Sequence, residues 1–188
     1  SATLVAALGD SITAGSPLWD PAAGSGDPTS QYEYWASLKD PSLEFRNCGV
    51  YGERTDEIAR RLERCAEGAE VLIVQGGIND IAQGGSLDRA AENLLGMVRA
   101  GKARGLRVAI AELLPWNNGY RQADPKIRRL NELIHDLGAA ENVPLLPFYG
   151  TLEDDERPGR MRESWTDDGD HPSIEGYRRL GELAFRLP

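Results

Sequence analysis

Serine and histidine side chains near opposite ends of this sequence could act together as a nucleophile and its base. Ser11 follows an apolar run in LVAALGDSITAG, and His171 lies in DDGDHPS with three acids beside it, Asp167, Asp168 and Asp170. A serine hydroxyl attacks a carbonyl efficiently only when a base takes its proton and a third group orients that base. These residue types predict acyl transfer, with Ser11 as nucleophile and His171 as base.

Each of these residues has an alternative structural role. A serine that follows a strand usually caps a helix or closes a turn, and Ser11 taken alone favours that interpretation. The other histidine, His135, lies in LNELIHDLG, a helical pattern typical of ordinary packing or a solvated edge. Only His171 combines a loop position with neighbouring acids that could fix its tautomer.

Acyl transfer also needs hydrogen-bond donors for the oxygen that becomes negative. The Ser11 amide, the bare backbone N–H of Gly49 and the Asn79 side chain are the candidates. Asn79 could instead tie two loops together, and Gly49 could serve a positive-φ turn. We expect Asp10 and Asp80 to accept loop N–H groups rather than to transfer protons.

The elements that must position these residues alternate between strand and helix. Continuous apolar runs predict strands at 3–8, 43–47, 70–75, 106–114 and 143–148. Helical patterns follow at 31–38, 56–65, 87–104, 125–137 and from 174 nearly to the end, with Ser30, Thr55, Ser86 and Ser173 as caps and Gly105 and Gly138 as stops. This order predicts a three-layer α/β/α sandwich of about five parallel strands, whose strand exits meet at one sheet edge.

The segment 16–30, SPLWDPAAGSGDPTS, has neither pattern. A loop after a strand exit can overhang a ligand crevice, so this segment is either a lid or wall of the site or a plain surface loop. We expect three residues to line the site: Trp19 in this loop, and Trp116 and Asn117 after a later strand.

Composition narrows the possible partners. The net charge is −9, which disfavours nucleic acid and anionic lipid surfaces. No apolar run has the roughly 18 residues of a membrane span. A metal site is disfavoured, because the sequence has only two histidines and no Cys/His cluster.

Cys48 and Cys65 favour two buried thiols, although a single bridge stays open. No targeting segment is visible, so both a cytoplasmic protein and a secreted one with its leader removed remain open, as does the oligomeric state.

Four blocks, GDSIT, NCG, GGIND and DGDHP, occur in order over nearly the whole chain. In this combination the sequence resembles the SGNH branch of the GDSL-type hydrolases. The resemblance implies a single catalytic domain over 1–188 with a flavodoxin-like sandwich and no metal or cofactor. It also implies a triad of Ser11, His171 and Asp168, and an oxyanion hole formed by the amides of Ser11 and Gly49 with the Asn79 side chain.

The sequence therefore predicts a serine esterase that acts on small, short-acyl esters through an acyl-enzyme. The same chemistry would also suit a carbohydrate deacetylase, a thioesterase or lysophospholipase, or an acyltransferase. The alternative from another class is a non-enzymatic flavodoxin-like module that binds an anion at its strand exits. Such a module has no use for an acid three residues before His171.

Overall fold

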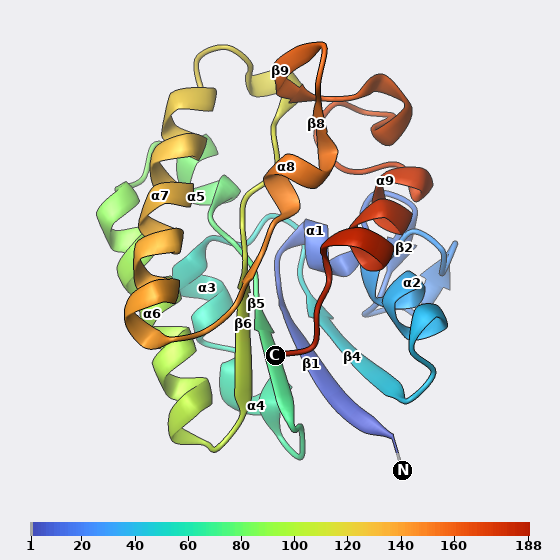
Figure 1. The fold of residues 1–188 in the computed structure, drawn as a ribbon, viewed down its shortest axis with the longest axis vertical. Coiled ribbons are helices and arrows are strands. Elements are labelled where there is room, and N and C mark those ends of the chain that lie inside the picture. Colours follow the sequence, from blue (N-terminus) through green and yellow to red (C-terminus); the bar gives the residue numbers. More distant parts are fainter. Residues whose placement is uncertain (1) are drawn as a thin grey trace.

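The computed structural model describes residues 2–188 and is built around one parallel sheet (Figure 1). Its strands pair in the order β4-β1-β5-β6-β7, and every pair in this sheet is parallel. The strands are β1 (Thr3–Gly9), β4 (Leu43–Gly49), β5 (Val71–Val74), β6 (Arg107–Ala111) and β7 (Leu145–Leu146). The five parallel strands predicted from the apolar runs are confirmed.

Helices cover both faces of this sheet (Figure 1). One face packs against α3 (Thr55–Ala59), α4 (Leu62–Ala66), α5 (Ile78–Ala82), α6 (Leu87–Ala103) and α7 (Asp124–Glu141). The other packs against α2 (Tyr32–Lys39), α8 (Phe148–Leu152) and α9 (Ile174–Arg179), which continues into a π-helical turn, Leu180–Ala184. Side chains of β1 alternate between the two faces, with Leu8 in one apolar core and Ala7 in the other. The predicted three-layer α/β/α sandwich is confirmed.

The predicted helix ends are only partly right. The single helix expected at 56–65 is two short helices, α3 and α4, with a turn at Arg60 and Arg61. Gly138 does not end α7, because it is buried against the Val143 carbonyl and the helix runs on to Glu141. The stop is Asn142, which has the left-handed conformation that closes a helix.

Two of the four predicted helix caps are confirmed. The Ser86 and Ser173 hydroxyls accept the N–H groups of Arg89 and Gly176 at the starts of α6 and α9. Ser30 was wrongly expected to cap, since its hydroxyl donates to the Gly15 carbonyl. Thr55 does not cap either, because its hydroxyl donates to Asp80.

The segment 16–30 is a folded hairpin, formed by β2 (Trp19–Asp20) and β3 (Ser25–Gly26). A second small hairpin that the apolar pattern does not predict joins β8 (Glu153–Asp154) to β9 (Arg157–Met161). The strands of both hairpins are only two to five residues long and contain no continuous apolar run, which is the pattern by which buried strands are detected.

Cys48 and Cys65 form a disulfide between the end of β4 and α4, with their Cα atoms 6.0 Å apart. The expectation of two free, buried thiols is therefore wrong. The two cysteines are 17 positions apart in sequence and are brought together by the packing of α4 against β1, the strand next to β4 in the sheet. Among residues 2–188, no helix combines the length and the apolar content that crossing a bilayer requires.

Glu33 lies in the first turn of α2 with only 2% of its surface exposed. Neither of its carboxyl oxygens has a hydrogen-bond partner among the described residues. Burial raises the pKa of Glu33 well above its ordinary value of 4.5. The folded chain therefore keeps a proton that the unfolded chain releases, and stability falls as the pH rises from about 4.5 towards the folded pKa.

We predict that Glu33→Gln removes this loss. The variant and the parent should unfold at similar temperatures near pH 4.5, and the variant should become the more stable of the two by pH 8, with roughly 2–4 °C in Tm for each 1 kcal/mol. Thermal unfolding followed by circular dichroism at several pH values measures this. Glu63→Gln, which changes an exposed acid on α4, should leave the pH dependence unaltered. Parallel pH profiles for the parent and Glu33→Gln would contradict the prediction.

Candidate active site

The turn after β1 presents Ser11 at the carboxyl edge of the sheet, as the first residue of α1 (Ser11–Ala14). The cap of this helix is Asp10, whose carboxylate accepts the Ile12 N–H at 2.9 Å. The capping role considered for Ser11 is thus filled by its neighbour. As expected, Asp10 and Asp80 both accept loop N–H groups, and Asp80 takes that of Thr55 at 2.9 Å.

Gln75, which follows β5, holds the same turn from the neighbouring strand. Its side-chain carbonyl accepts the Asp10 N–H, the Thr13 N–H and the Thr13 hydroxyl, the last at 2.8 Å. Gly9 is required there because a Cβ would collide with Thr13 and Gln75. From the other face, the buried Tyr177 hydroxyl of α9 donates to the Ser16 carbonyl at 3.0 Å.

His171 is oriented by Asp168 and not by the other two acids. Asp168 Oδ2 lies 2.7 Å from His171 Nδ1, and Asp168 Oδ1 accepts the backbone N–H groups of Asp170 and His171, each at 2.8 Å. Asp170 instead accepts the Trp116 indole N–H at 2.6 Å. Because Nδ1 is engaged by a carboxylate, Nε2 is the ring nitrogen left to face the cavity.

The pKa values of Asp10 and Asp168 are shifted in opposite directions. Burial raises the pKa of Asp10 to about 6, and the hydrogen bond from Ile12 offsets only part of this. Partial burial would also raise the pKa of Asp168, but hydrogen bonds from His171 and Asp170 outweigh it and lower the pKa below its ordinary value. Asp168 therefore stays ionised at neutral pH.

Asn118 fixes the loop that carries Asp168 and His171. Its side-chain amide donates to the Asp168 carbonyl and to Asp170 Oδ1, both at 2.8 Å, and its backbone N–H donates to the Gly169 carbonyl. Sequence reasoning did not identify this residue. Its position beside Trp116 and Asn117, after a strand exit, was the one available signal.

Ser11 and His171 line one cavity of about 160 Å³, although they are 160 positions apart in the chain. The remaining lining residues are Ile12, Tyr51, Gly52, Ile78, Asn79, Ala82, Trp116 and Asp170. Among residues 2–188, the Ser11 hydroxyl and His171 Nε2 have no hydrogen-bond partner. They are also not hydrogen-bonded to each other. Both groups are therefore available to a molecule in the cavity.

Gly49 does not offer a free amide to this cavity. Its N–H donates to Asn47 Oδ1 at 3.0 Å, and it is a glycine because a Cβ would strike the backbone of Ala14. It is also not at positive φ. Gly52, three residues later, has a φ of 80° and lines the cavity. Within residues 2–188, no protein acceptor is bonded to the Gly52 N–H or the Ser11 N–H.

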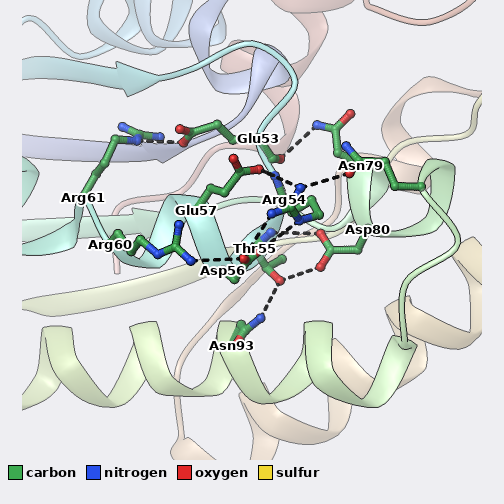
Figure 2. A network of polar contacts seen from close by, with 11 residues as sticks. Glu53, Arg54, Thr55, Asp56, Glu57, Arg60, Arg61, Asn79, Asp80 and Asn93 are labelled. Carbon is green, nitrogen blue, oxygen red and sulfur yellow. Dashed lines mark hydrogen bonds and ion pairs between the residues drawn. The ribbon is translucent and has the colours of Figure 1, made fainter.

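Asn79 lines the cavity and is oriented from behind (Figure 2). Its amide nitrogen donates one hydrogen to the Glu53 carbonyl at 3.0 Å, which leaves a second hydrogen unused. Arg61 supports the same loop, because it pairs with the Glu53 carboxylate at 2.7 Å and donates to the carbonyls of Gly9 and Cys48. The loop that carries Gly52 is thereby tied to the ends of β1 and β4.

The three residues expected to line the site lie in different places. Trp116 lines the cavity with Ser11. Trp19 lines a neighbouring cavity of about 420 Å³. Asn117 exchanges two hydrogen bonds with the backbone of Met161 and so anchors β9. His135 pairs with Glu112 at 2.6 Å with about half of its side chain exposed, in keeping with the expected solvated edge.

Residues 7–179 match the model of the GDSL-like Lipase/Acylhydrolase family. The chain belongs to this family. Among solved structures, a member of the lipolytic protein G-D-S-L family from Veillonella parvula superposes with a TM-score of 0.81 at 21% identity, covering 96% of this chain and 94% of the other. The lipase/acylhydrolase from Enterococcus faecalis gives 0.78 at 22% identity, covering 97% and 93%. No curated protein matches the chain.

Membership of the GDSL-like family makes this protein a hydrolase of ester substrates. It sets aside the alternative of a non-enzymatic anion-binding module. The similarity to the family that the four sequence blocks indicated is confirmed. The solved structures are too distant in sequence to indicate more than the shared fold.

We predict that Asn118→Ala lowers kcat about 10-fold on a small chromogenic ester, because the loop of Asp168 and His171 loses two side-chain hydrogen bonds and its geometry loosens. KM should change little, since Asn118 does not line the cavity. Asn117→Ala is the matched control, because it also loses two hydrogen bonds but to β9. It should lower thermal stability with a smaller effect on kcat. Equal kcat values for the two variants would contradict a positioning role for Asn118.

Proposed function

We propose that this chain is a serine esterase that hydrolyses small, short-acyl carboxylic esters through an acyl-enzyme. The observation that carries the proposal is the common cavity of Ser11 and His171, with His171 Nδ1 held 2.7 Å from Asp168. A free hydroxyl, a free ring nitrogen and an ionised acid behind the ring are the components of nucleophilic acyl transfer.

In the first step, Ser11 Oγ attacks the ester carbonyl carbon while His171 Nε2 takes the hydroxyl proton. The carbonyl oxygen becomes negative and is received by the unpartnered N–H groups of Ser11 and Gly52 and by the second amide hydrogen of Asn79. We assign Gly52 to this role in place of Gly49, because the Gly49 N–H already donates to Asn47. Asp168 stays ionised and stabilises the imidazolium.

In the second step, His171 Nε2 returns the proton to the leaving alcohol oxygen as the bond between carbon and that oxygen breaks. A water molecule then gives a proton to His171 Nε2 as its oxygen attacks the carbonyl carbon of the Ser11 ester. The bond from that carbon to Ser11 Oγ breaks, Nε2 returns the proton to Ser11 Oγ, and the carboxylic acid leaves. The reaction requires no redox change, and protons are conserved over the cycle.

The preference for a short acyl group rests on a small apolar pit beside the cavity. It has a volume of about 20 Å³. Most of its lining is apolar, formed by Ile12, Ile78, Leu113, Leu114, Pro115 and Trp116, and the polar residues Gln75, Glu112 and Asp170 complete it. A void of about 10–15 Å³ holds one water molecule, so this pit has room for a group near the size of a methyl. An acetyl group fits, and a long acyl chain would require these side chains to move.

Ser11→Ala should reduce hydrolysis of p-nitrophenyl acetate by at least about 1,000-fold, because the nucleophile is lost while the oxyanion donors remain. His171→Ala should have an effect of similar size. His135→Ala is the matched histidine control and should keep close to full activity. A fluorophosphonate probe followed by peptide mass spectrometry should label Ser11. Full activity of Ser11→Ala, or labelling of a different serine, would overturn the assignment.

Asn79→Ala should lower kcat about 100- to 1,000-fold, because one donor to the developing oxyanion disappears. Asn93→Ala provides the comparison, since Asn93 belongs to the same polar network but donates to Thr55 and does not line the cavity (Figure 2). Steady-state kinetics and thermal unfolding of both variants measure the effect. A kcat for Asn79→Ala within a few-fold of that of Asn93→Ala would contradict the oxyanion role.

A further inference from the structure

The loop from Cys48 to Gly52 borders three cavities in succession. Gly52 and Tyr51 line the catalytic cavity, and Tyr51, Val50 and Gly49 line the neighbouring cavity of about 420 Å³. Val50 and Cys48 line a third, of about 690 Å³. Tyr51 lines both the first and the second cavity, and Val50 and Ala22 line both the second and the third, so the three cavities lie side by side along this loop. We call this row of cavities the groove. Four Cα steps separate its ends, so the loop itself spans at most about 15 Å.

The middle of this groove suits an uncharged group. Its walls carry Pro17, Trp19 and Pro21 from the hairpin segment, facing Val50 and Tyr51. Among the described residues, Asp20 is the one acid in this lining; its Oδ1 accepts the N–H groups of Ala22 and Ala23, and the negative charge that it keeps disfavours an anion in the middle of the groove. Flat aromatic surfaces with few free polar groups favour a ring or an alkyl segment.

The far end of the groove is positively charged, although the chain as a whole carries −9. Arg46, Arg61 and Arg64 line it, with Glu67 as the one acid. Arg61 is neutralised by Glu53. Arg46 donates to the carbonyls of Cys65 and Glu67, which hold its guanidinium without cancelling its charge. Among the described residues, neither Arg46 nor Arg64 forms an ion pair with a carboxylate.

The leaving alcohol of a bound ester would enter this groove. His171 must protonate the alcohol oxygen, so the alcohol lies on the side of His171. The Tyr51 ring is there, with its centre 5.9 Å from that of His171, and Tyr51 is also the first wall of the groove. Neither Tyr51 nor His171 lines the apolar pit for the acyl group, whose walls include Leu113 and Leu114.

We propose that the groove binds the alcohol part of the substrate and that Arg46 and Arg64 recognise an oxyanion, a carboxylate or a phosphate, at the far end of that alcohol. This inference rests on the proposed esterase function and names its substrate class. The substrate is a short-acyl ester of an alcohol with an uncharged middle and an anionic end. Guanidinium groups fit both oxyanions through paired N–H donors.

The test uses acetate esters of ω-hydroxy acids with two to ten methylenes, compared with the corresponding primary amides, which have no charge. The ratio of kcat/KM for acid over amide should be near one for the shortest chains and rise to roughly 3- to 10-fold once the carboxylate reaches the arginines. Monoacetates of diols that end in a phosphate monoester, against the free alcohols, form the second arm. The arm with the larger ratio identifies the oxyanion.

Arg64→Gln should bring the larger ratio back towards one, and Arg46→Gln should do the same, whereas Arg46→Lys keeps the charge and should retain part of it. Arg104→Gln, an exposed arginine at the end of α6, is the matched control and should leave the ratio unchanged. Within residues 2–188, the Arg64 side chain makes no hydrogen bond, so its loss should not unfold the protein. Ratios at or below one at every length, or ratios unaffected by both variants, would overturn the proposal.

A binding measurement separates this inference from the esterase proposal. Calorimetric titration of the ω-acetoxy acid and its amide into Ser11→Ala reads anion recognition without turnover. Tighter binding of the acid supports the groove even where p-nitrophenyl acetate is not hydrolysed, and that second result would count against the esterase proposal alone. Hydrolysis of p-nitrophenyl acetate together with equal affinities for acid and amide would overturn the groove alone.

Discussion

The site depends on the hydrogen bonds by which one side chain, Gln75, holds the turn between β1 and α1. Its carbonyl oxygen accepts three donors from Asp10 and Thr13, so the end of β5 fixes the backbone that carries Ser11. These donors are the first groups after a strand, where the ladder no longer supplies acceptors, and leaving them unpaired in a buried turn would be costly. The same turn must expose the Ser11 N–H and hydroxyl to the cavity. Gln75 therefore fixes the turn on the side away from the cavity, and the groups that face the cavity stay unbonded.

The loop with Asp168 and His171 follows the same arrangement. Asp168 accepts three hydrogen bonds from its own loop, two from backbone N–H groups and one from the His171 ring, so the acid shapes the loop and orients the ring at once. Asn118 and Trp116 then attach this loop to the segment after β6. A short exposed loop without these ties would sample many conformations, and the distance from Ser11 to His171 would vary accordingly.

The sequence predicted what local chemistry determines. Buried parallel strands are continuous apolar runs, so β1, β4, β5 and β6 could be located, and the three-residue spacing of Asp168 and His171 closes within one turn. The sequence did not show which of several possible hydrogen-bond partners a group would choose. Gly49 ends β4 and Gly52 follows it three residues later, and the bond from the Gly49 N–H to Asn47 Oδ1 determines which of the two amides is free. The Cys48–Cys65 disulfide likewise depends on where α4 crosses the sheet. Ser30 and Thr55 fit the cap pattern, but each hydroxyl has a tertiary acceptor instead.

One arginine links the oxyanion donors to the groove for the alcohol. Arg61 donates to the carbonyls of Gly9 and Cys48 and pairs with Glu53, whose own carbonyl orients Asn79. The charge of Arg61 is therefore paired, and its N–H groups donate to the fold. Arg46 and Arg64 at the same end of the groove have no carboxylate partner among residues 2–188. A bound oxyanion would supply that partner. The segment from Cys48 to Glu53 would then meet the substrate at both ends, at the reacting carbonyl through Gly52 and at the anionic end through the cavity beside Cys48. The segment from Cys48 to Glu53, which Arg61 holds in place, would then fix the anionic end of an alcohol of the right length at a constant distance from the oxyanion donors.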